Sequence, residues 1–203
     1  MYLVKGLTKF LVNTGKKLFI KDENALIYKF LIIGDKEVGK TSFINKALDD
    51  TFDLEIPSTS DIEYHNMEFT LGFNKINIIL VDLATSQLSK KHAYFFNDIN
   101  GAFILYDITK YETFKKVQTY ICDIQSLGLN TPLIVVGNKT DLKNLRQVHE
   151  KELKDLACQF NCDHCETTCT SGTSVIDIVK FMVFKSYYNS LNNEEKEEIL
   201  KML

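Results

Sequence analysis

The feature that most constrains this chain is the stretch IIGDKEVGKTSF at positions 32–43, where an apolar run meets a glycine and then Gly-Lys-Thr. It fits the pattern GxxxxGK[ST] between a predicted strand and a predicted helix. In such a loop, backbone N–H groups hold phosphate oxygens, the lysine reaches the terminal phosphates, and the hydroxyl after it binds magnesium. A glycine turn into an amphipathic helix is the alternative. The residues of this predicted phosphate loop are Gly34, Asp35, Lys36, Glu37, Val38, Gly39, Lys40, Thr41 and Ser42.

Short β-branched runs alternate with helical patterns along most of the chain. We expect strands at 25–33, 75–81, 101–107 and 131–137. Helical patterns follow Lys40, Thr109, Gln147 and Ser174. Residues 62–71 are the exception, because only three residues, Gly-Phe-Asn, separate them from the strand at 75–81, which predicts an antiparallel hairpin. We therefore predict an α/β fold with a six-stranded, mostly parallel sheet, one antiparallel edge strand, and helices on both faces.

Composition excludes several classes of function. The 203 residues are 45% apolar and 25% charged, which suits one domain with extensions. A net charge of -3 and a pI near 5.8 offer no general attraction to polyanions, so we do not expect nucleic-acid binding. No apolar run approaches the roughly 18 residues of a membrane span. We expect a cytoplasmic protein.

Two segments lie outside the predicted core, which spans residues 25–190. Residues 1–24 form a basic, amphipathic extension for which three alternatives stay open: packing on the domain, lipid or partner contact through residues 1–21, and disorder. Residues 191–203 predict a short acidic helix with Asn193 as its N-cap.

A cluster of cysteines, Cys158, Cys162, Cys165 and Cys169 with His164 among them, resembles a zinc site at first sight. Paired CxxC spacing is absent, so we favour buried, reduced cysteines over metal ligands.

A second motif follows the strand at 131–137, in the order Asn138-Lys139-Thr140-Asp141. A carboxylate at Asp141 can accept both the ring N–H and the exocyclic amine of guanine, a pairing that adenine cannot offer. An ordinary capped loop is the alternative for NKxD alone, but behind a phosphate loop the motif indicates GTP or GDP.

These residues resemble the Ras superfamily of small GTPases, and most of all its Rab branch, from about residue 25 to 190. Three segments carry the resemblance beside the two motifs: LYDITKYETF, NKTDLKNLRQV, and ETTCTSG, which is similar to the family's ETSAK loop. The resemblance implies the G domain of P-loop NTPases and a cofactor set of GTP or GDP with Mg²⁺.

The resemblance also implies further site residues. Thr59 matches the switch I threonine that binds Mg²⁺, Phe52 the aromatic beside guanine, and Asp82 the carboxylate that holds Mg²⁺ through water; Thr41 completes the magnesium set. The guanine end would be contacted by Asn138, Lys139, Asp141, Thr168, Cys169 and Thr170.

The chain departs from the family where hydrolysis is catalysed. Switch II begins DxxGQ in the family, but Thr85 and Ser86 replace the glycine and the glutamine that orients water. Lys36 and Glu37 stand where most relatives carry small residues, and we expect them to crowd the γ-phosphate. No intact catalytic residue is therefore predicted.

The function that follows is a GTP-binding switch, or a constitutively GTP-loaded adaptor of vesicle traffic, with weak or absent hydrolysis. Effectors and regulators would bind its switch I and switch II surface. A nucleotide-independent scaffold and a GTPase with another water-positioning residue are the alternatives. The sequence ends without a cysteine after Cys169, so we expect no prenyl anchor.

Overall fold

The computed structural model describes residues 26–48, 54–55, 62–71, 74–83, 96, 98–170 and 175–202. The predictions for the extension at 1–24, for Phe52 and Thr59, and for Thr85 and Ser86 lie outside the described residues.

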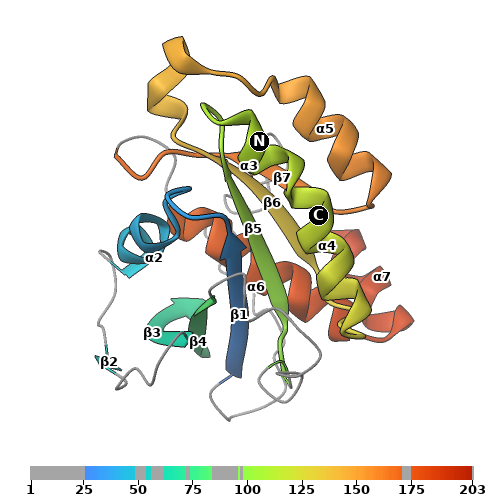
Figure 1. The fold of residues 1–203 in the computed structure, drawn as a ribbon. Helices are drawn as coiled ribbons and strands as arrows, with labels where there is room; N and C mark the ends of the chain where they lie inside the picture. The colour runs from blue at the N-terminus through green and yellow to red at the C-terminus, as the bar shows by residue number, and fades with distance from the viewer. Residues whose placement is uncertain are drawn as a thin grey trace.

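The centre of the fold is a sheet in the order β2-β3-β4-β1-β5-β6-β7 (Figure 1). The strands are β1 (Leu26–Gly34), β2 (Leu54–Glu55), β3 (Ile62–Leu71), β4 (Asn74–Leu83), β5 (Gly101–Asp107), β6 (Leu133–Asn138) and β7 (Asp163–Glu166). Strand β1 lies parallel to β4 and β5, and β6 is parallel to β5 and β7. The predicted mostly parallel sheet of six strands is confirmed, and so is the antiparallel hairpin of β3 and β4.

Two short strands are not located by the sequence pattern. Strand β7 supplies the sixth strand of the predicted sheet, but its four residues, DHCE, lack a β-branched run. Strand β2 has two residues and pairs antiparallel with β3, so the sheet continues one short strand beyond the predicted edge. Both strands are too short to give a periodic signal.

Helices cover both faces of the sheet, as predicted (Figure 1). On one face, α2 (Lys40–Leu48) and α6 (Val175–Ser190) pack on Phe30 and Ile32 of β1. On the other, α3 (Tyr111–Lys115), α4 (Val117–Ser126) and α5 (Glu150–Gln159) share a core with Leu31 and Ile33. Alternate residues of β1 thus enter two separate cores, as expected for a strand between two helical layers.

The C-terminal helix α7 (Asn193–Met202) is present as predicted, but its cap is one residue earlier. The Asn192 side chain accepts a hydrogen bond from the Glu195 N–H at 2.9 Å, and the Glu195 carboxylate accepts one from the Asn192 N–H at 3.0 Å. This reciprocal pair is a capping box, so the prediction of Asn193 as the cap is wrong. Among the described helices, none is long and apolar enough to cross a membrane.

The cysteines differ in burial. Cys158 and Cys122 are exposed, contrary to the prediction of buried cysteines, whereas Cys165 is buried. Burial raises the pKa of Cys165 to about 12 and that of Cys162 to about 11. Within the described part of the chain, no group of three or more metal-ligating side chains comes together.

Candidate functional site

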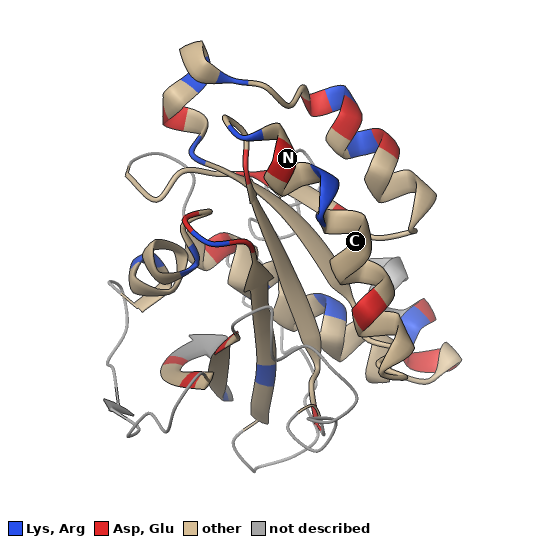
Figure 2. Cartoon of the chain, viewed as in Figure 1, with Lys and Arg blue, Asp and Glu red and all other residues tan. Residues whose placement is uncertain are grey.

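The predicted phosphate loop lies at the carboxyl edge of the parallel strands, between the end of β1 and the start of α2. Strands β5 and β6 end beside it in Asp107 and Asn138, which pair with each other in the sheet register. Figure 2 shows acidic and basic residues alternating along this loop, and basic residues on the turn after β5 that faces it. Ligands of doubly wound sheets bind at this edge, next to the point where the strand order reverses.

Lys40 places its charge at the beginning of the loop. Its Nζ donates to the carbonyl of Gly34 at 2.9 Å and to that of Asp35 at 3.1 Å. Lys40 is also the first residue of α2, whose N–H groups and dipole favour anions at this end. The loop therefore presents a lysine and a helix N-terminus together, which suits phosphate.

Asn138 joins the loop to the end of β6. Its buried side chain donates from Nδ2 to the Val38 carbonyl at 2.9 Å, and its Oδ1 accepts from the Lys139 N–H at 2.8 Å. A Cβ built on Gly39 would come within 2.4 Å of Asn138 Nδ2, and Gly39 has φ +96°. Only glycine allows this approach and this conformation. The two predicted motifs, about a hundred residues apart in sequence, thus form one packed unit.

Lys139 bridges the end of β5 and the loop. Its Nζ lies 2.7 Å from Oδ2 of Asp107 and donates to the Glu37 carbonyl at 2.6 Å. Burial opposes the charge of Asp107, but hydrogen bonds from Lys139 and Thr109 outweigh it and lower the pKa of that carboxyl. Lys139 therefore holds the loop backbone at Glu37, while its ion pair with Asp107 keeps the lysine in position.

The predicted base-binding end is assembled from η3 (Thr140–Leu145) and the segment after β7. Asp141 is exposed, and its Oδ1 accepts from the Thr168 hydroxyl at 2.5 Å. Thr168 in turn lies 2.8 Å from the Thr170 hydroxyl. For Oδ2 of Asp141, the described residues provide no hydrogen bond. Cys169 contacts Asn138, with Sγ donating to Oδ1 at 3.6 Å.

Asp82, the predicted magnesium ligand, lies near the end of β4. Burial raises the pKa of its carboxyl, Lys40 opposes this, and Glu63, directly opposite on β3, adds to it. A nearby cation would favour the ionised carboxylate, which suits Mg²⁺. Thr41 is exposed in the first turn of α2.

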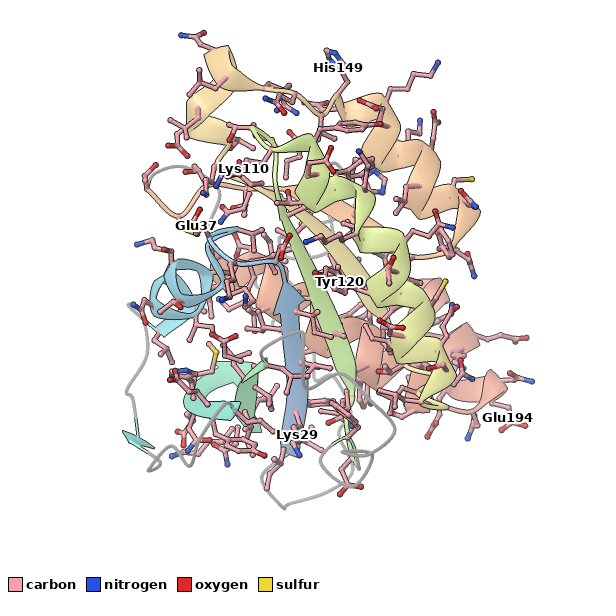
Figure 3. The ribbon with its side chains drawn as sticks, in the orientation of Figure 1. Lys29, Glu37, Lys110, Tyr120, His149 and Glu194 are labelled. Carbon is pink, nitrogen blue, oxygen red and sulfur yellow. The ribbon has the colours of Figure 1, made fainter. Side chains whose placement is uncertain are left out.

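The two acids of the loop are both paired with lysines of the segment after β5. Lys116 Nζ lies 2.5 Å from Oδ2 of Asp35, and Lys110 Nζ lies 2.7 Å from Oε2 of Glu37. Figure 3 shows Glu37 and Lys110 near each other, beside the carboxyl-terminal part of β5. Hydrogen bonding from these lysines lowers the pKa of both acids. For Glu37, the balancing positive charge comes from Lys110.

A hollow of about 380 Å³ lies between the loop and α3, lined by Asp35, Lys36 and Lys110 among others. It shares Asp35 and Lys36 with the predicted phosphate loop, but Lys40 and Asp141 are not among its lining residues.

Several residues outside the two motifs support the predicted site, although their sequence context does not mark them as functional. Lys110 and Lys116 pair with the two acids of the loop, and Asp107 pairs with Lys139. Arg146 forms a two-pronged ion pair with Glu166 at 2.6 and 2.8 Å, which ties the segment leading to Thr168 to the residues after η3. These pairs join distant segments, and the only local hint is the polar residue at the end of β5.

Comparison with known proteins places the chain. A model of the Ras family matches residues 29–188. The GTP-binding protein ypt3 of Schizosaccharomyces pombe is 30% identical over 158 residues, covering 76% of this chain and 73% of that protein. The Ras-related proteins Rab-27B of Bos taurus, at 27% identity (77% of this chain, 78% of the relative), and Rab-11A of Dictyostelium discoideum, at 28% (76% and 73%), are similar over the same region. With the sheet and loop described above, these matches confirm the predicted G-domain fold. The chain is a Rab-like member of the Ras family of small GTPases.

Proposed function

We propose that this protein is a guanine-nucleotide switch that binds GTP or GDP with Mg²⁺. The observation that supports it best is the link between Asn138 and the Val38 carbonyl. This link holds the loop next to Lys40, the proposed phosphate end, against the end of β6 that leads to Asp141, the proposed base end. The names of the relatives, a GTP-binding protein and Rab-related proteins, agree with this function and favour a role in vesicle traffic.

Nucleotide and metal fit the residues present. The phosphate groups would lie on the loop backbone and Lys40, guanine against Asp141, and Mg²⁺ near Thr41 and Asp82. The magnesium ion would neutralise charge on the phosphates. Thr59 and Phe52 join this set on the family resemblance alone.

We propose that hydrolysis is slow or absent. Thr85 and Ser86 replace the flexible glycine and the water-orienting glutamine of switch II, and intact relatives turn over unaided at only about 10⁻⁴ per second. Partner proteins would then bind a form that stays loaded with GTP. Effectors and regulators would use the switch surface, and residues 1–21 are the candidate membrane contact.

The direct test is the nucleotide content of the purified chain. We expect GDP or GTP to be released on denaturation and identified by chromatography. Lys40→Met should lower nucleotide affinity about a hundredfold, because a charged hydrogen-bonding partner of the phosphates is lost. Lys154→Met, an exposed lysine of α5, serves as the control and should bind normally. If the unaltered protein binds no guanine nucleotide with added Mg²⁺, a nucleotide-independent scaffold is the better description.

Single-turnover hydrolysis tests the proposed defect. The double change Thr85→Gly with Ser86→Gln should raise the rate at least tenfold, since it restores both the mobile backbone N–H and the group that orients water. A rate for the unaltered protein equal to that of intact relatives would instead indicate another water-positioning residue.

A further inference from the structure

Glu37 brings a carboxylate into the predicted phosphate loop, and the backbone there is held in place. Its φ of 62° lies in the left-handed region, which non-glycine residues rarely adopt. The Glu37 carbonyl accepts from Lys139 Nζ at 2.6 Å, and the next carbonyl, that of Val38, accepts from Asn138 Nδ2 at 2.9 Å. Two side chains from the end of β6 thus set the direction in which the Glu37 side chain leaves the loop.

The residue that receives this carboxylate is Lys110, 73 positions farther along the chain, at 2.7 Å. Lys110 is the N-cap residue of α3 and is itself anchored: its N–H donates to the Asp107 carbonyl at 3.0 Å, and its carbonyl accepts from the Thr113 hydroxyl at 2.7 Å. The lysine therefore lies on a fixed turn at the carboxyl edge of the sheet (Figure 3).

The pair is exposed, with 77% of the Glu37 and 48% of the Lys110 side chain accessible to solvent. Exposed ion pairs contribute little to stability. The main effect of the Glu37–Lys110 pair is therefore local, because it balances one negative charge and directs the Glu37 carboxylate toward α3. Lys116 is paired with Asp35, and Lys139 is paired with Asp107 and reaches only the Glu37 carbonyl, so Lys110 is the main partner of the Glu37 carboxylate.

The negative charge of Glu37 would repel a polyphosphate bound to the loop. Repulsion between like charges rises with the charge on the ligand, and a nucleoside triphosphate carries about one more negative charge than a diphosphate at its terminal group. An unbalanced Glu37 would accordingly disfavour GTP more than GDP.

We propose that Lys110 sets the relative affinity for GTP and GDP. By pairing with Glu37 it keeps that carboxylate on the α3 side of the loop, so that a triphosphate can bind as well as a diphosphate. This inference rests on the proposed function. Lys110 acts through Glu37, so it is a positioning residue rather than a group in contact with the nucleotide.

The test is a double-mutant cycle of Lys110→Met and Glu37→Gln, with dissociation constants of GTP and GDP measured by titration calorimetry in the presence of Mg²⁺. Lys110→Met should lower the ratio of GTP to GDP affinity about tenfold. The same change in the Glu37→Gln background should leave the ratio unaltered, because no carboxylate is then unbalanced. The tenfold effect should also shrink as salt is raised.

Lys115→Met is the matched control, since Lys115 is a neighbouring exposed lysine paired with Glu112 of its own helix. It should change neither affinity. Equal losses of GTP and GDP affinity in Lys110→Met, or a loss that persists in the Glu37→Gln background, would overturn the inference while leaving the proposed function intact. Failure of the unaltered protein to bind either nucleotide would overturn both.

Discussion

Asparagine in place of Asp141 is expected to lower the affinity for GTP and GDP by about 10³-fold or more. The carboxylate can accept two N–H groups of guanine. Asparagine presents its amide N–H to one of these groups, so the amide donor and that guanine donor face each other without an acceptor. Its Oδ1 can still accept the hydrogen bond that the Thr168 hydroxyl gives to Asp141 at 2.5 Å, so the loop should keep its shape. Competition titration against a fluorescent guanine nucleotide measures the loss.

The same substitution should improve binding of xanthine nucleotides, because their second carbonyl accepts where guanine donates. Xanthosine triphosphate is therefore a positive control that separates lost recognition from lost folding. Asp155→Asn, an exposed acid of α5, should leave both affinities unchanged. An Asp141→Asn protein that binds GTP as tightly as before would show that Asp141 does not contact the base.

Alanine at Gly39 is expected to reduce the free energy of unfolding by about 3 kcal/mol and to impair nucleotide binding. The added Cβ would lie 2.4 Å from Asn138 Nδ2, and φ is +96°. Asn138 cannot move away freely, because its side chain is buried and holds both the Val38 carbonyl and the Lys139 N–H. Thermal unfolding should show a midpoint about 10 °C lower.

Gly128 provides the matched control for this substitution. It also has a positive φ, +76°, but a Cβ there would meet nothing within 4 Å. Gly128→Ala should therefore carry only the backbone cost, about 1 kcal/mol. If the two alanine variants unfold at the same temperature, the close approach of Gly39 to Asn138 does not constrain the protein.

Local patterns in the chain are sufficient for the main elements of the fold. The strand at 101–107 is predicted with the bounds that β5 has, because a short apolar run ends in a polar residue. The predicted phosphate loop begins at the last residue of β1 and ends in the first turn of α2. It can be located from the sequence because the glycine spacing and the Lys-Thr pair are local signals. Local patterns do not predict strands β2 and β7, because these residues become strands by pairing with a neighbouring strand rather than through their own composition.

The sequence by itself determined the residue types at the two motifs, the alternation that predicts a parallel sheet, and the presence of Thr85 and Ser86, on which the proposed slow hydrolysis depends. Only the tertiary structure decided which charges meet. Glu37 pairs with Lys110, Asp35 with Lys116 and Asp107 with Lys139, across separations that carry no periodic signal. The physical reason is that parallel strands bring their carboxyl ends to one edge of the sheet, so side chains meet there irrespective of their distance along the chain.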